Sequence, residues 1–145
     1  MRVFLDTDVL VSASVRQHQH FAESAAVLNR CAAGEEVGII HAHSLLEYHS
    51  AITQLPRGLA VPPAHVSTLL NDGILPFVRC VSLDVEEITR VQIRAGELGV
   101  VGGMIYDLFP LSVAMRENVD RLYTFNTGHF RALAEPGFRD RIVNP

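Results

Sequence analysis

VFLDTDVLV, residues 3–11, places two acidic side chains between two apolar runs. Residues 2–5 are mostly apolar and β-prone, so we expect a short buried strand that ends at Asp6. An acid directly after a buried strand lies at the carboxyl edge of the sheet, where ligands bind in α/β proteins. Asp6-Thr7-Asp8 could equally turn the chain and cap a helix. Two acids in alternate positions between apolar runs favour a functional role over a turn or cap. A buried carboxylate needs a partner, and a cation is a suitable one.

The rest of the chain alternates between strand and helix patterns. Further strands are expected at 37–40, 77–83, 120–125 and 141–143, and helices at 20–34, 44–54, 63–70, 84–98, 104–118 and 127–133. Alternation of this kind predicts an α/β fold with a mainly parallel central sheet and helices on both faces. No linker or repeat interrupts the pattern, so we expect one domain over residues 1–145.

Composition indicates a globular, cytoplasmic protein. The 145 residues are 48% hydrophobic and 19% charged, enough for one domain with a real core. No apolar run approaches the ~20 residues of a membrane span, and the N-terminus meets acid too early for a signal peptide. Cys31 and Cys80 lack CxxC spacing, so we interpret them as buried, reduced thiols.

The basic residues are all arginine. Twelve Arg and no Lys suit phosphate contacts, although genomic composition bias would give the same count. The net charge of −4 argues against a protein coated in basic surface. A nucleic acid would therefore have to meet a local Arg patch beside an acidic metal centre, since an acidic site without metal repels phosphate.

Two further acids occupy candidate helix starts. Ser44 and Glu47 in HSLLE fit the S-x-x-E capping box, which is compatible with a Glu that also points to the strand edge. Asp107 lies in the apolar stretch MIYDLFPL, where a charge is costly without a role. Proline is tolerated in a first helical turn, so Pro110 predicts that Asp107 stands near a helix start, either functional or as a plain N-cap.

A fourth polar cluster, Asn126 to His129, follows the last long apolar run. His129 could contact phosphate or shuttle a proton, or it could be an exposed helix-start residue. The H-x-H pairs at 18–20 and 41–43 lack a second spaced pair of ligands, so we do not expect zinc.

Carboxylates that meet at one sheet edge can hold a divalent metal. Hard oxygen ligands suit Mg²⁺ or Mn²⁺, and these ions usually act on phosphate substrates. The three separated acids Asp6, Glu47 and Asp107 therefore point to a metal-dependent nuclease.

The chain resembles the PIN-domain family, and most closely its VapC-type ribonuclease toxins. FLDTDVLV is similar to the family's opening strand with its first metal-binding Asp, here Asp6. HSLLEYHSAITQLP resembles the segment that carries the family's Glu, here Glu47, and GGMIYDLFPLSVAM the helix with a further Asp, here Asp107. LYTFNTGHF resembles the closing strand, with Thr124 in the hydroxyl position.

Three positions depart from that family pattern. Asp8 stands where the family usually has Asn, and neutral Asn126 stands at the position of its frequent fourth acid. Pro110 replaces the small or aliphatic residue that usually follows the helix Asp. These changes could lower metal affinity or turnover.

The resemblance implies an Mg²⁺- or Mn²⁺-dependent endoribonuclease, the toxin of a type II toxin–antitoxin pair. It implies catalytic roles for Asp6, Glu47, Asp107 and Asn126, metal binding by the first three, and support from Asp8, Thr124 and His129. The implied partners are an RNA substrate such as tRNA, a small antitoxin protein and a second copy in a homodimer. Apolar helix surface at Leu45, Ile52 and Leu55 could contact the antitoxin.

Two rival interpretations remain. A haloacid-dehalogenase-type phosphatase also has D-x-D after its first strand, but it uses a Lys beside the phosphate and this chain has none. A degenerate PIN domain that only binds RNA or protein is favoured by Asn126 and opposed by the retention of three acids.

Overall fold

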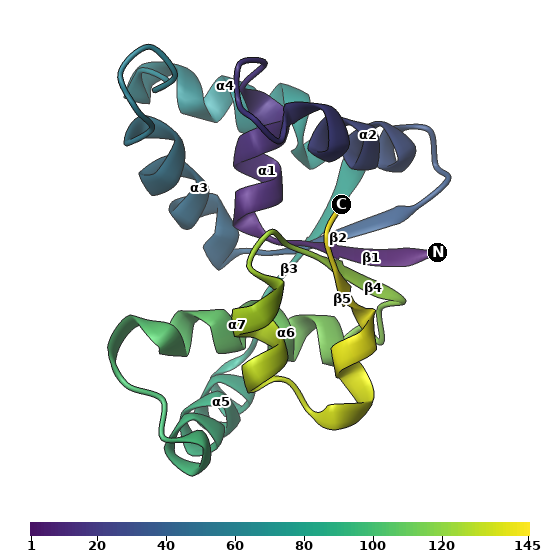
Figure 1. Ribbon diagram of the computed structural model, residues 1–145, viewed down its shortest axis with the longest axis vertical. Helices are drawn as coiled ribbons and strands as arrows, with labels where there is room; N and C mark the ends of the chain where they lie inside the picture. Colours follow the sequence, from purple (N-terminus) through teal and green to yellow (C-terminus); the bar gives the residue numbers. More distant parts are fainter.

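The computed structural model describes all 145 residues and contains a five-stranded sheet in which every strand pair is parallel (Figure 1). The strands are β1 (Arg2–Leu5), β2 (Val37–His41), β3 (Val78–Val81), β4 (Arg121–Tyr123) and β5 (Ile142–Val143), in the order β3-β2-β1-β4-β5. This confirms the predicted α/β class. Because β1 is central, its carboxyl end is flanked by the ends of β2 and β4.

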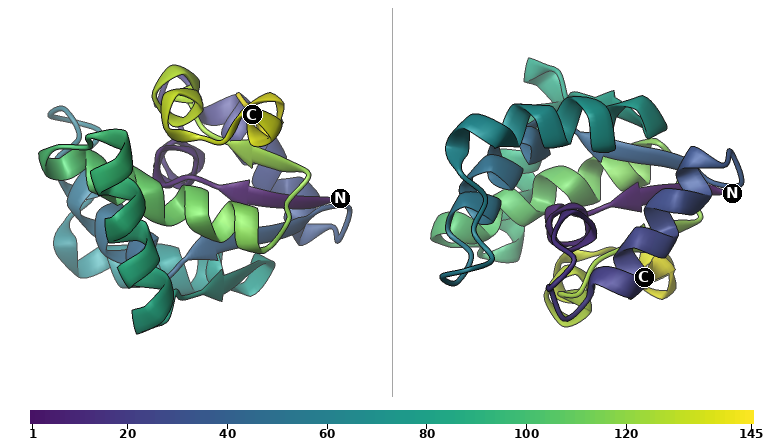
Figure 2. Two further views of the ribbon diagram at one scale, coloured as in Figure 1. Left: turned by 90° about the horizontal axis from the view of Figure 1, so that it is seen from below. Right: turned by 90° about the horizontal axis from the view of Figure 1, so that it is seen from above.

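Helices cover both faces of the sheet (Figures 1 and 2). One face carries α1 (Thr7–Ser14), α2 (Phe21–Ala32), α3 (His43–Thr53) and α4 (Pro63–Gly73). The other carries α5 (Val85–Leu98), α6 (Ile105–Arg116) and α7 (Thr127–Leu133). Short 3₁₀ turns lie at Leu75–Phe77, Gly102–Met104 and Pro136–Arg141. None of the helices combines the length and apolar character needed to cross a bilayer.

Successive side chains of β1 belong to two separate hydrophobic clusters, one on each face of the sheet. Val3 and Leu5 pack with the helices α1 to α4, whereas Phe4 packs with α5 to α7. The neighbouring strand β2 divides in the same way at Ile39 and Ile40. Successive side chains of a strand point to opposite faces, so a strand buried on both faces has a continuous apolar run.

The helix α1 was expected only through the alternative that Asp6-Thr7-Asp8 caps a helix, and Asp6 is its N-cap. Five of its eight residues are buried, including Val9, Leu10 and Val11, so it lacks the polar face that would give a helical period. The helix predicted at 127–133 is confirmed at the same residues. The strands predicted at 77–83 and 120–125 are shorter, because a 3₁₀ turn precedes β3 and the chain leaves the sheet after Tyr123.

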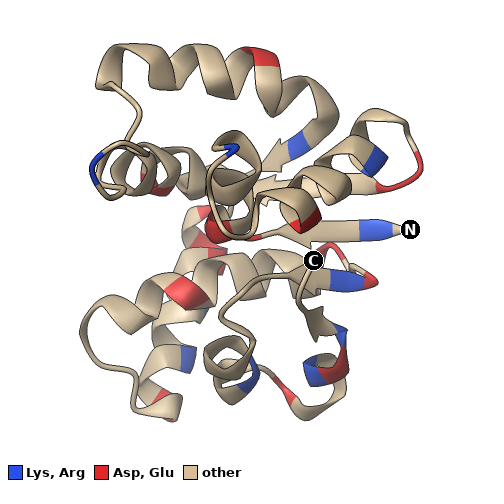
Figure 3. Ribbon diagram, turned by 45° about the horizontal axis from the view of Figure 1, so that its top comes forward, with Lys and Arg blue, Asp and Glu red and all other residues tan.

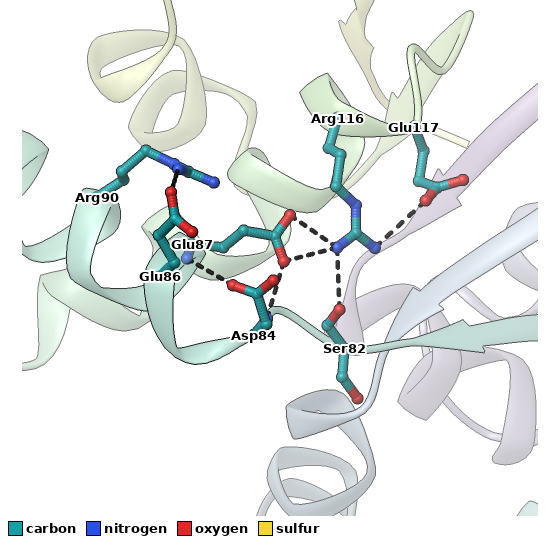
Figure 4. A network of polar contacts seen from close by, with 7 residues as sticks. All are labelled: Ser82, Asp84, Glu86, Glu87, Arg90, Arg116 and Glu117. Atoms are coloured by element: carbon teal, nitrogen blue, oxygen red, sulfur yellow. Dashed lines mark hydrogen bonds and ion pairs between the residues drawn. The ribbon is translucent and has the colours of Figure 1, made fainter.

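A capping box begins α5. Asp84 accepts a bond from the Glu87 backbone N–H, and the Glu87 side chain accepts one from the Asp84 N–H, each at 2.8 Å. Arg116 at the end of α6 then binds both Glu87 carboxylate oxygens at 2.9 and 3.0 Å, and the Ser82 carbonyl at 2.9 Å (Figure 4). This network joins α5 to α6.

The capping box predicted at Ser44 and Glu47 is wrong. The helix α3 begins one residue earlier, at His43, so Ser44 is inside it and buried, and Ala42 is an N-cap without a side-chain bond. Pro110 was expected in the first turn of its helix, but it lies inside α6, five residues after Ile105.

Two expectations about exposure are corrected. Ile52, proposed as part of an exposed apolar surface, is fully buried, and Leu45 and Leu55 pack partly against the same core. Cys31 is buried as expected, but Cys80 is exposed; both thiols are free, in agreement with the reduced state predicted for them.

Candidate functional site

The first part of the site joins residues from the two ends of the chain. Asp6 follows β1 and caps α1, where its Oδ1 accepts a bond from the Thr7 N–H at 2.8 Å. Thr124 follows the paired strand β4, and its Oγ1 lies 2.8 Å from Asp6 Oδ2 and 3.2 Å from Asp8 Oδ2. A hydroxyl has a single proton to donate. Thr124 can therefore satisfy only one of the two carboxylates at a time.

Asp8 is left short of donors. Its Oδ2 accepts a bond from the Phe125 N–H at 2.9 Å, but its Oδ1 is buried without a hydrogen bond. The Asn126 N–H donates to Thr124 Oγ1 at 3.0 Å and so fixes the hydroxyl in place. A buried carboxylate oxygen without a donor is costly unless water or a cation satisfies it.

Electrostatics at this pair favour an added positive charge. Burial, reinforced by repulsion from Asp8, raises the pKa of Asp6 to about 8. The hydrogen bonds from Thr124 and Thr7 oppose that rise, and Glu47 adds a smaller repulsion. Burial also raises the pKa of Asp8. A cation beside these carboxylates would favour their ionised forms.

Glu47 reaches the same place from the first half of α3. Its Oε2 accepts a bond from Thr7 Oγ1 at 2.9 Å, and its Oε1 lies 3.2 Å from His43 Nε2. Thr7 also donates its backbone N–H to Asp6. One residue therefore links the acid at the end of β1 to the acid on α3.

Asp107 approaches from α6 on the other face. It stands in the first turn, as predicted, although Met104 and not Asp107 is the N-cap. Its Oδ2 lies 2.9 Å from His129 Nδ1, and that nitrogen is 3.1 Å from Asn126 Nδ2. Burial raises the pKa of Asp107, and the neighbouring His129 counteracts part of the rise.

All seven predicted site residues thus belong to one polar network at the carboxyl ends of the central strands, in which Asn126 joins Thr124 to His129. Figure 3 shows acidic residues gathered near the end of the sheet opposite the N-terminus. The side chains do not form a preformed cage, since no three His, Cys, Asp or Glu groups converge closely enough to hold an ion. Mg²⁺ usually keeps several waters and binds through one or two carboxylates, so oxygen donors in this arrangement fit that ion.

Three contributors were missed from the sequence. Thr7 lies between the two acids of D-T-D, a position that gave a signal for a turn but none for its bond to Glu47. His43 lies four residues before Glu47, a spacing that places both on one helix face. His20 stacks on Phe125, with ring centroids 4.1 Å apart and planes 18° apart, beside Asp8.

A sequence model of the PIN domain matches residues 3–136, which include every residue of the site. The chain belongs to the PIN-domain family. A comparison with curated protein sequences finds no significant match.

Solved structures share the PIN fold along almost the whole chain. VapC20 of Mycobacterium tuberculosis, described as a toxin that cleaves the sarcin–ricin loop, is 14% identical with a TM-score of 0.69, and 99% of each chain is covered. VapBC2 of Rickettsia felis, bound to a promoter DNA fragment, is 18% identical with a TM-score of 0.66, and covers 100% of this chain and 99% of its own. FitAcB of Neisseria gonorrhoeae is 19% identical with a TM-score of 0.63, over 99% and 96% of the two chains.

Proposed function

We propose that this PIN domain is a metal-dependent endoribonuclease and the toxin of a type II toxin–antitoxin pair. The observation that carries the proposal is the Asp6–Asp8 pair, held by one Thr124 hydroxyl and leaving a buried carboxylate oxygen without a donor. Such a pair suits a cation better than it suits a structural cap. The similarity in fold to VapC20, described as an RNA-cleaving toxin, supports RNA as the substrate.

The proposed metal ligands are Asp6, Glu47 and Asp107. Because the three carboxylates do not converge on one point, one or two would bind Mg²⁺ or Mn²⁺ directly and the rest through the waters that complete its coordination. When bound, such an ion lowers the pKa of a water that attacks the phosphodiester and stabilises the developing negative charge. The raised pKa values of Asp6 and Asp107 fit this assignment, because a neighbouring positive charge would favour their ionised forms.

The other residues hold these carboxylates in position. Thr124 fixes Asp6 and Asp8 relative to each other. His129 holds Asp107 through Nδ1, which leaves Nε2 to contact a phosphate oxygen or exchange a proton with the leaving group. Asn126 lies against His129 and adds a neutral amide that can orient water or phosphate.

The proposed partners are an RNA such as tRNA, a small antitoxin and a second copy of the chain, in the cytoplasm. The fold shared with VapBC2 and FitAcB supports the antitoxin, and the homodimer is proposed from the family resemblance alone. Because Ile52 is buried, antitoxin contacts on α3 would have to use other side chains, of which Leu46 is the most exposed apolar one at 70%.

Cleavage of total cellular RNA and of tRNA by the purified protein with Mg²⁺ or Mn²⁺ tests the proposal. Discrete fragments that disappear with EDTA and with Asp6→Asn are expected. Asp72→Asn is the matched control, since this exposed carboxylate on α4 makes no hydrogen bond or ion pair, and it should cleave as the wild type does. Undiminished cleavage by both Asp6→Asn and Asp107→Asn would contradict the proposed site.

The alternative is a degenerate PIN domain that binds RNA or protein without cleaving it. The neutral Asn126 and the absence of a preformed three-ligand cage favour it. Calorimetric titration with Mn²⁺ separates the two: binding that Asp6→Asn removes supports the nuclease, whereas no binding together with no cleavage supports the binding module.

A further inference from the structure

Four aromatic rings form one cluster at the carboxyl edge of the sheet. They belong to His41 at the end of β2, His43 at the start of α3, and Tyr106 and Phe109 in α6. The His43 and Tyr106 rings are 5.5 Å apart between centroids with planes 17° apart, and Tyr106 and Phe109 are 6.3 Å apart at 18°. Phe109 is also near-parallel to His41, at 5.8 Å and 15°. These three pairs are near-parallel, whereas His43 is tilted by 46° to His41 and by 33° to Phe109.

This cluster adjoins two of the proposed metal ligands. His43 contacts Glu47 through Nε2 at 3.2 Å, and Tyr106 directly precedes Asp107 in the first turn of α6. The two exposed rings of the cluster come from opposite faces of the sheet, one on each side of the site. A group bound over these rings would lie beside the acidic centre.

The exposure of the rings does not fit a purely structural role. The cluster is anchored by His41, which is only 7% exposed, but Tyr106 is 51% exposed and the side chain of His43 is 36% exposed. The other two tyrosines of the chain, Tyr48 and Tyr123, are buried in the core. A fixed aromatic ring with half its surface open offers a flat apolar face to a ligand.

We propose that Tyr106 and His43 form a stacking platform for an unpaired RNA base next to the scissile phosphate. This inference rests on the proposed nuclease function and names the form of its substrate. Base stacking on aromatic rings is uncharged and tolerates any base, so it supplies affinity where carboxylates repel the RNA backbone. Bases within a duplex already stack on one another, so the platform selects loops or single strands.

The experiment measures RNA affinity without cleavage. Asp6→Asn serves as the inactive background, and fluorescence anisotropy in Mg²⁺ follows a fluorescein-labelled, mixed-sequence single-stranded RNA oligonucleotide. Tyr106→Leu removes the ring and keeps apolar bulk, whereas Tyr106→Phe keeps the ring. Phe77→Leu is the matched control, because this 38% exposed ring directly precedes β3 and therefore lies at the amino end of the strand, whereas the site lies at the carboxyl ends. A series of the same RNA with one abasic position each locates the stacked base.

Loss of the platform should raise the Kd of Tyr106→Leu by at least about fivefold, since stacking is worth roughly 1 kcal/mol or more per base. Tyr106→Phe and Phe77→Leu should bind the RNA with the affinity of the Asp6→Asn protein. All three variants should also have the Tm of that protein. One abasic position should weaken the binding of the RNA to the Asp6→Asn protein by a similar factor. The same abasic position should leave the affinity of the Tyr106→Leu variant unchanged. An RNA duplex should show no difference between the variants.

Unchanged affinity of Tyr106→Leu would overturn the proposal, as would equal sensitivity of both proteins to every abasic position. In either case a ring that affects only the binding of a protein partner would be indicated. Because affinity is measured in an inactive variant, failure of RNA cleavage by the wild type would overturn the nuclease assignment without touching this result. Conversely, if the wild type cleaves RNA but Tyr106→Leu does not change the affinity for RNA, only the proposed stacking platform would be refuted.

Discussion

Replacing Asp6 by Asn should stabilise the metal-free protein while it removes the proposed activity. The amide oxygen can still accept the bond from the Thr7 N–H, and Asn is as good an N-cap as Asp. The amide nitrogen can donate to Thr124 Oγ1, whose proton is then free for Asp8. The substitution therefore keeps every hydrogen bond and removes only a desolvated negative charge.

The pKa of Asp6 sets the direction and the size of the effect. Its value of about 8 in the folded protein lies above the ordinary 3.8. The protonated Asp6 contributes fully to the stability of the folded protein below pH 3.8. This contribution is lost as the pH rises through the folded-state pKa of about 8, and the free energy of unfolding falls by up to about 1.4 kcal/mol per pH unit. Because the protein relaxes and admits water around the ionised group, we expect about 2 kcal/mol, or about 4–8 °C in Tm for a domain of this size.

Thermal unfolding in EDTA between about pH 5 and pH 8.5 measures this difference. The Tm of the wild type should fall more steeply with pH than that of Asp6→Asn, which should be the more stable protein at the alkaline end. Mn²⁺ should raise the Tm of the wild type and leave the variant unchanged. Parallel pH profiles for wild type, Asp6→Asn and the control Asp72→Asn would refute the proposed desolvation of Asp6.

Three other substitutions test separate parts of the molecule. Thr124→Val should lower cleavage at least about tenfold, because it removes the hydroxyl that orders two carboxylates, and Thr124→Ser should restore most of it in the same assay. Gly38→Ala should lower the free energy of unfolding in urea by about 1–3 kcal/mol, since its Cβ would lie 2.9 Å from both Cys31 Sγ and Val78 Cγ1. Asp84→Ala should cost about 1 kcal/mol by the same measurement through loss of the α5 cap, and Asp84→Asn should cost much less.

Elements with their own local signals could be predicted from the sequence. The helix predicted at 84–98 is found as α5, which begins at the Asp84 cap and ends at Gly99, a residue with the left-handed φ of 66° that ends a helix. The buried helix α1 gave only the cap signal at Asp6, because residues that face the core on nearly every side show neither a helical nor a strand period.

The candidate residues of the site could be named from the sequence, but their hydrogen-bond and ion-pair partners could not. Asp6, Glu47 and Asp107 were identified from their positions at strand ends and helix starts. The bond from Thr7 to Glu47 and the contact of Asp107 with His129 depend on how helices from the two faces meet, which no local pattern specifies. The failed box at Ser44 has the same origin, since the packing of α3 begins the helix one residue early.

The central position of β1 has a consequence for biosynthesis. Its carboxyl-end acid is held by a hydroxyl that follows β4, 118 residues later, and the sheet is completed only by β5 at Ile142–Val143. A nascent chain that has not yet reached Thr124 has the bond from the Thr7 N–H to Asp6 but lacks the hydroxyl that contacts both Asp6 and Asp8. Prematurely terminated fragments would likewise lack the closing strands. The geometry required for the proposed chemistry is therefore reached only after β4, Thr124 and β5 have all been synthesised.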